Sequence, residues 1–435
     1  MRRVYLSTVS KPMDEAPAAG PRRRRLALVS GNVVALGTVS LITDVSAEMV
    51  TAVLPLYLVL GLHVSPLAYG VIDGVYTGAT ALLRLVGGFV ADRIRSRKLV
   101  AGLGYTLSAV AKLGLLLAGR SMTAIGAVIA VDRLGKGVRT APRDALITAS
   151  SPPEALGRAF GVHRTMDGIG AFLGPLAALA VLAAAGESYD AVFVTSFCVA
   201  ALAVVVLVLF VRERPDGGTT EAPKVSGTTE APKVGGKPQA PKVTVGEAAG
   251  LLRAAPVRRL VAAACLLGLA TIGDGFVYLM LQRREDLSLV WFPLLAVGTS
   301  LAYLLLATPM GLLADRIGRL PVVLGGYAAL GVTYALLFGP VGGWPLLVVT
   351  LALHGLFYAA TDGVLVALAG PVLPVRLRTT GIALIQTGQA LAYLVSSVLF
   401  GLAWQAWGPQ AASRVAALGV ALVVVATLLL LRKKR

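Results

Sequence analysis

Charged residues are scarce in this sequence. They make up 14% of the 435 residues, and hydrophobic residues make up 56%, whereas about a quarter of a soluble protein of this length is charged. From residue 31 onward, apolar runs recur that are long enough to cross a bilayer core, for which about 20 residues suffice. Because backbone groups in lipid must hydrogen-bond internally, these runs are predicted to be helices. We therefore expect an all-α polytopic protein embedded in the lipid bilayer.

Cysteines and common catalytic motifs are also few or missing. Cys198 and Cys265 are the only cysteines, and each lies in an apolar run without a metal-ligand partner nearby, so we interpret both as small core residues. The sequence has no H-E-x-x-H and no G-x-S-x-G motif, which argues against an intramembrane enzyme. No short apolar run precedes the basic residues 22–25, so no cleavable signal peptide is expected. We expect neither a metal nor another cofactor.

Acidic residues are outnumbered by basic ones, 22 against 40, and the formal net charge is +18. In a soluble chain this excess would suggest nucleic-acid binding. Here the basic residues gather in alternate connections between the apolar runs, which is a signal of membrane topology. The positive-inside rule predicts that both termini lie in the cytoplasm. We expect a bacterial cytoplasmic membrane protein with no nucleic-acid partner.

The apolar runs fall into two groups of six, separated by a polar linker. A basic tail (1–30) precedes the first group (31–211). The second group, with a basic tail at its end, covers 257–435. The linker (212–256) repeats A-P-K-V at 222, 231 and 240 without apolar periodicity, so it is predicted to be a disordered cytoplasmic spacer. The twelve spans are expected near 31–60, 66–91, 98–119, 122–145, 156–185, 190–211, 257–281, 289–314, 320–340, 344–370, 377–404 and 410–431.

A charged turn, A-D-R-I, occurs at 91–94 and again at 314–317, about 223 residues later, which suggests two related halves. Basic side chains suit helix ends, where carbonyl groups lack partners. The aspartate of each turn can pair with an arginine or cap a helix of the other half. We therefore predict a cytoplasmic gate, and a plain topology signal is the simpler alternative. The gate residues would be Gly88, Asp92, Arg93, Arg143, Gly311, Asp315 and Arg316.

Twelve spans, a long central connection and the repeated G-x-x-A-D-R turn resemble the major facilitator superfamily. The resemblance implies two six-helix bundles related by pseudo-two-fold symmetry, and a secondary transporter that is not an enzyme. Residues 133–137 are similar to the R-x-x-Q-G pattern of proton-linked drug exporters, with Lys136 in place of the glutamine. The exporters' glycine motif in span 5 is matched, apart from its last two glycines, by Gly161, Gly170, Gly174 and Pro175. In that family the motif accompanies antiport.

Ionisable residues within the spans are a sharper signal, because one at the bilayer centre costs about 2.5–3.5 kcal/mol even on the milder scales. Asp44 and Glu48 in span 1 are four residues apart and share one helix face. Two close carboxylates in a low dielectric favour protonation of one of them, as coupling to a proton gradient requires. Permanent pairing with arginine is the structural alternative.

Spans 4 and 5 supply further ionisable groups near this pair. Arg133 and Lys136 are predicted to pair with Asp44 or Glu48. Span 5 carries its own polar residues, and its glycines are predicted to let helices approach and seal the boundary between the two halves. A histidine there would relay protons or serve a structural role. The span 5 candidates for the proton site and central cavity are His163, Arg164 and Asp167.

The second half has fewer polar residues within its spans. They fall on shared helix faces and suit substrate recognition in a mostly apolar cavity, although core polarity explains each one alone equally well. These candidates are Asp274, Tyr278, His354, Tyr358, Asp362, Gln386, Gln389 and Tyr393.

Two functions remain open from the sequence. One is proton-coupled antiport that exports a small, partly apolar drug or metabolite. The other is proton-coupled uptake or exchange of an anionic metabolite, held by a clamp of Arg133, Lys136, Arg139 and Arg164. A sensor would usually carry an additional soluble domain. We expect a small-molecule substrate, a proton as coupling ion and a monomer.

Overall fold

The computed structural model describes residues 30–78, 96–152, 156–213, 250–362, 368, 372–374 and 378–432, and the regular structure in these ranges is helical. The first half contains α1 (Gly31–Leu56) with a π-helical extension (Tyr57–Gly61), a helical segment at 66–78, α3 (Arg97–Ala118), α4 (Met122–Ala149), α5 (Leu156–Ala184) and α6 (Tyr189–Phe210). The second half contains α8 (Ala255–Leu269), α9 (Asp274–Glu285), α10 (Pro293–Ile317), α11 (Arg319–Leu336), α12 (Gly343–Thr361), α14 (Arg378–Trp407) and α15 (Pro409–Arg432). Short helices lie at Leu251–Arg253 (η3) and Leu289–Trp291 (η4).

Ten helical stretches of the described ranges are long and apolar enough to cross a membrane. The helix α4 has 28 residues and is not among them because it carries several charges. Large apolar side chains remain on the outward surface, where Leu117 of α3 is 89% exposed and Leu422 of α15 is 72% exposed. Such a surface would be unfavourable in water and suits contact with lipid tails. The predicted all-α membrane architecture is therefore confirmed.

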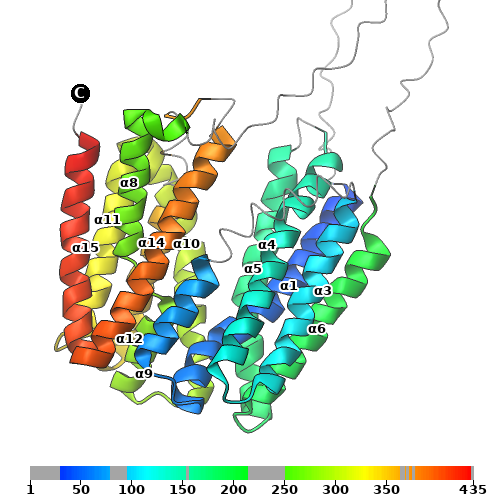
Figure 1. Ribbon diagram of the computed structural model, residues 1–435, viewed down its shortest axis with the longest axis horizontal. Helices are drawn as coiled ribbons and strands as arrows, with labels where there is room; N and C mark the ends of the chain where they lie inside the picture. Colours follow the sequence, from blue (N-terminus) through cyan, green and yellow to red (C-terminus); the bar gives the residue numbers. More distant parts are fainter. Residues whose placement is uncertain are drawn as a thin grey trace, which may run out of the picture.

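The helices form two groups (Figure 1). In one, α1 packs against α5 and α6, and α3 packs against α4 and α6. In the other, α8 packs against α14, α10 against α12, and α11 against α12 and α15. The helices α5 and α10 pack against each other across the boundary between the groups.

Close packing of α3 on α4 brings charged residues of the two helices together. A Cβ atom on Gly104 would meet the backbone oxygen of Gly135, and a Cβ atom on Gly135 would meet that of Gly104. The absence of side chains at both positions thus lets the helices approach closely. About two turns further along α3, Lys112 reaches Asp132 of α4.

The seventh span is broken in its middle. We predicted a continuous helix over 257–281, and this is wrong because α8 ends at Leu269 and α9 begins at Asp274. Ile272 lies in the break, and its backbone N–H donates to the hydroxyl of Tyr334 at 2.9 Å. This bond satisfies one of the backbone groups that the interrupted helix leaves without a helical partner. Broken helices at mid-membrane depth are tolerated where they line a cavity.

Candidate transport cavity

A cavity of about 870 Å³ lies between the two halves. Its first-half wall comes from α1, the segment 66–78, α4 and α5, and its second-half wall comes from α8 to α14. Seven of the lining residues are tyrosines: Tyr69, Tyr76, Tyr278, Tyr303, Tyr327, Tyr358 and Tyr393. Apolar and aromatic walls with a few polar groups are typical of small-molecule sites, and the volume suits a drug-sized ligand.

The structure brings most of the predicted site residues to this cavity. Those that line it are Glu48, Arg133, Lys136, Asp274, Tyr278, Tyr358, Asp362, Gln386, Gln389 and Tyr393. Asp44, His163, Arg164, Asp167 and His354 are not among the lining residues. Arg164 is exposed, whereas His163 is buried and lies 3.4 Å from Asp167 on the same face of α5.

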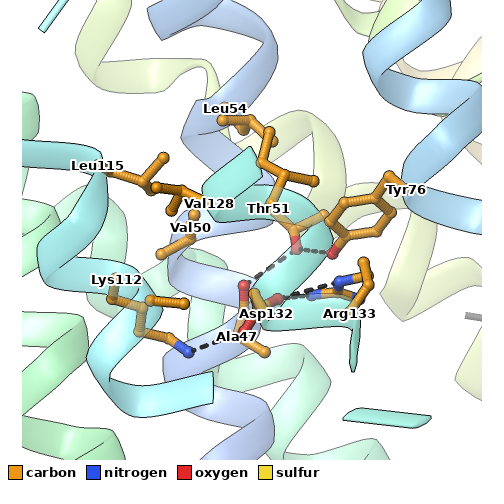
Figure 2. A pocket seen from close by; sticks show the side chains of 12 residues that line it. Ala47, Val50, Thr51, Leu54, Tyr76, Lys112, Leu115, Val128, Asp132 and Arg133 are labelled. Atoms are coloured by element: carbon orange, nitrogen blue, oxygen red, sulfur yellow. Dashed lines mark hydrogen bonds and ion pairs between the residues drawn. The ribbon is translucent and has the colours of Figure 1, made fainter. Parts of the chain in front are cut away.

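Arg133 belongs to a buried ion cluster within the first half (Figure 2). Its guanidinium binds the Asp132 carboxylate, and the Nζ of Lys112 lies 3.6 Å from the same carboxylate. The guanidinium also stacks 3.7 Å from the centroid of the Tyr76 ring, and the Tyr76 hydroxyl bonds that of Thr51 at 2.8 Å. The predicted pairing of Arg133 with Asp44 or Glu48 is therefore wrong, because Asp132, its neighbour in the chain, provides the carboxylate.

Lys136 is the basic residue most strongly coupled to the span 1 carboxylates. It makes the largest favourable charge interaction of both Asp44 and Glu48. Glu48 and Lys136 both line the cavity, and Asp44 lies one helical turn from Glu48. The wall therefore carries Glu48 and Lys136, and Asp44 adds a second carboxylate one turn away along α1.

Arg143 lies toward the C-terminal end of α4 and contacts α1. Its guanidinium pairs with Asp144 at 3.0 Å and donates to the hydroxyl of Ser40 at 3.1 Å. Its expected partner Asp92 lies outside the described residues, as do Gly88 and Arg93. Asp315 and Arg316 are exposed at the end of α10.

The glycines of α5 pack within one half. A Cβ atom on Gly170 would meet Leu41 and Asp44 of α1, and one on Gly174 would meet Glu48. A Cβ atom on Gly161 would meet nothing within 4 Å. The prediction that this stripe seals the boundary between the halves is wrong in this conformation, because its partner α1 belongs to the same half. Pro175 lines the cavity.

The boundary is instead closed by glycines that our sequence analysis missed. In the segment 66–78, a Cβ atom on Gly70 would collide with the backbone of Ser397, and one on Gly74 with that of Leu394. Gly70, Gly74 and Gly78 are spaced four residues apart, so the small-x-x-x-small pattern was visible in the sequence. The same boundary holds Asp73, which we had not included in the site.

Asp73 joins the two halves through hydrogen bonds. It accepts from the hydroxyl of Tyr393 at 2.9 Å and from that of Ser397 at 2.5 Å, both on α14. On the second-half wall, Asp274 accepts from the hydroxyl of Tyr358 at 2.5 Å and lies 3.4 Å from Nε2 of His354. His354 thus supports Asp274 from behind the cavity wall.

The family of the chain follows from comparison with known proteins. The family model of the Major Facilitator Superfamily matches residues 36–299 and 291–435. The chain belongs to the Major Facilitator Superfamily (MFS). An uncharacterised MFS-type transporter of Methanocaldococcus jannaschii is 28% identical over 386 residues, which are 87% of this chain and 89% of that protein. An uncharacterised protein of Mycobacterium tuberculosis is 38% identical over 158 residues, 36% of this chain and 38% of that protein.

Solved MFS structures share the fold. The nucleoside transporter NupG superposes with a TM-score of 0.75 at 14% identity, over 93% of this chain and 100% of that chain. A bacterial homologue of the human lysosomal transporter Spinster, solved in an inward-facing, unoccupied conformation, gives 0.64 at 16% identity, over 92% and 94%. This MFS protein is thus a transporter of small molecules, not an enzyme, and its cavity occupies the place where alternating-access transporters bind substrate.

Proposed function

We propose that this MFS transporter is a proton-coupled antiporter that exports a small, partly apolar drug or metabolite. The observation that carries the proposal is the cavity of about 870 Å³, which has a charged first-half wall and a wall rich in tyrosine and amide groups in the second half. The first wall supplies groups that can bind and release protons. The second supplies apolar surface and hydrogen-bond partners for a substrate.

The proton site would be formed by Asp44, Glu48 and Lys136. Lys136 interacts with both carboxylates. Of these three residues, Glu48 and Lys136 line the cavity and Asp44 does not. A movement of α4 relative to α1 would change the distance from Lys136 to these carboxylates and hence their tendency to hold a proton. Proton binding and the change of conformation would then be coupled.

The conformation is one state of an alternating-access cycle. Close contacts between the segment 66–78 and α14 close the boundary at the end opposite the C-terminus (Figure 1). Two side chains of the cavity, Asp362 and Gln386, are exposed and lie toward the other end of their helices. With the C-terminus in the cytoplasm, this cavity would be open to the cytoplasm and would receive substrate from there.

Uptake of an anion has weaker support. Of the four cations of the expected clamp, Arg133 and Lys136 line the cavity, and Arg139 and Arg164 do not. Arg139 is buried against the ring of Tyr105, 4.6 Å from its centroid. Both of these wall cations already have carboxylates nearby, Asp132 for Arg133 and Asp44 and Glu48 for Lys136.

A screen of a host strain with and without the transporter gene tests the proposal. We expect expression to lower cellular accumulation of at least one antibiotic or metabolite, and a protonophore to abolish this effect. Expression that raises accumulation of an anion would favour the alternative. Export that continues unchanged with the protonophore would exclude proton coupling.

A further inference from the structure

Two carboxylates, one from each half, meet at the break in the seventh span. Asp73 lies against the backbone of Gly273, because a Cβ atom added to Gly273 would collide with the Asp73 carboxylate. Asp274 is the next residue and begins α9. Both carboxylates line the cavity, and when both are ionised their negative charges repel each other.

Within the described part of the chain, no lysine or arginine forms an ion pair with either carboxylate. Their partners are hydroxyl groups and His354. The basic residues of the cavity wall, Arg133 and Lys136, lie instead beside other acidic residues of the first half. In the described part of the chain, the two carboxylates at the break therefore have hydroxyl and imidazole partners and no lysine or arginine partner.

Tyrosine side chains lie around the two carboxylates. Tyr358 and Tyr393 donate their hydroxyls to the two carboxylates, and Tyr69 and Tyr278 line the same cavity. Carboxylates and aromatic rings that line one cavity are a combination that recognises organic ammonium groups, because the face of an aromatic ring attracts a cation.

We infer that the cavity binds an organic cation with an apolar or aromatic body, whose charged nitrogen or onium centre lies between Asp73 and Asp274. This inference names a substrate class for the export proposed above and rests on that proposal. The ligand contacts both halves at once, so its charge offsets the repulsion between the two carboxylates. Loss of the ligand restores this repulsion across the boundary between the halves.

Equilibrium binding to the purified full-length transporter in detergent tests the inference without a proton gradient. The probes are tetraphenylphosphonium and tetraphenylborate, ions of similar size and shape but opposite charge. We expect the wild-type protein to bind tetraphenylphosphonium at least tenfold more tightly than tetraphenylborate. The variants Asp73→Asn and Asp274→Asn should each weaken tetraphenylphosphonium binding at least tenfold, and Asp190→Asn, on the exposed start of α6, should leave it unchanged.

The inference is overturned if the wild-type protein binds no tetraphenylphosphonium, if it binds tetraphenylborate as tightly, or if both cavity variants bind like the wild type. Size-exclusion profiles check that each variant is folded, and the comparison of the two ions on the wild-type protein needs no variant. Binding of the cation without gradient-driven transport would refute only the proton coupling. Gradient-driven transport with a preference for the anion would refute only the substrate class.

Discussion

At the residue scale, Asp132 holds two buried cations in place. The side chains of Lys112 and Arg133 are 4% and 5% exposed, and both pair with its carboxylate. Asp132→Asn keeps the size of the side chain but leaves two buried charges without compensation. Breaking a buried ion pair in this way costs about 3–5 kcal/mol, so we expect a clear loss of stability.

The midpoint of thermal unfolding in detergent measures this loss. The double variant Lys112→Met/Asp132→Asn removes one of the two unpaired cations and should recover part of the stability. Asp190→Asn, at an exposed position, serves as the control for the loss of one carboxylate. An unfolding midpoint of Asp132→Asn equal to that of the wild type would show that the ion cluster does not stabilise the fold.

Asp44 gives a test of coupling. We expect Asp44→Asn to abolish transport driven by a pH gradient, because the amide cannot release a proton. The dissociation constant of tetraphenylphosphonium should stay within about twofold of the wild-type value, since Asp44 does not line the cavity. Proteoliposomes with an imposed pH gradient measure the transport. Wild-type coupling in this variant would remove Asp44 from the proton site.

Several residues that line the cavity could be predicted from the sequence, but their partners could not. Charges within apolar spans are costly, so Glu48, Arg133 and Asp274 were evident before the fold was known. The partner of Arg133 is its sequence neighbour Asp132. Helical periodicity alone does not show whether Arg133 pairs with Asp132 or with a carboxylate of span 1. Asp73 was not included in the predicted site because its partners lie on α14, more than 300 residues away in the sequence.

At the scale of helices, close packing between the segment 66–78 and α14 keeps one end of the cavity shut. Gly74 contacts the backbone of Leu394, so that Gly74→Leu would force the two helices apart. We expect this variant to favour the conformation that opens at this end. The matched control is Gly419→Leu on α15, because a Cβ atom there would meet nothing within 4 Å.

Labelling of a single cysteine measures the opening. Ile72 lines the cavity and is 9% exposed, so Ile72→Cys in a background without Cys198 and Cys265 reports access from this end. A membrane-impermeant maleimide added at the side of residues 62–65 should label it at least fivefold faster with Gly74→Leu. Equal rates in the glycine variant and its control would show that this contact does not close the cavity.

The two glycine patterns show what helical periodicity can predict. Small residues four apart do indicate close helix contacts in both α5 and the segment 66–78. The sequence does not say which neighbour makes the contact, and that neighbour decides whether a stripe belongs to a bundle core or to the boundary between halves. The break in the seventh span was missed for a related reason. No proline marks it, and Gly273 is needed there because of Asp73, a residue of the other half.

At the scale of the whole molecule, the orientation in the membrane decides to which side this conformation opens. The contacts between the segment 66–78 and α14 lie at the end of the molecule opposite the C-terminal end of α15 (Figure 1). If that end of α15 lies at the cytoplasmic side, this conformation is open to the cytoplasm. The basic residues 432–435 favour that orientation. Arg120, in the connection between α3 and α4, should then face the opposite side.

Reporter fusions in a bacterial host test the orientation. Green fluorescent protein after residue 435 should be fluorescent, because it folds in the cytoplasm, and alkaline phosphatase at the same position should be inactive. Alkaline phosphatase inserted after Arg120 should be active, because it needs the oxidising periplasm to form its disulfides. The opposite pattern would place the open end of the cavity outside the cell. The structure would then be an outward-open state, and the predicted orientation with both termini in the cytoplasm would be wrong.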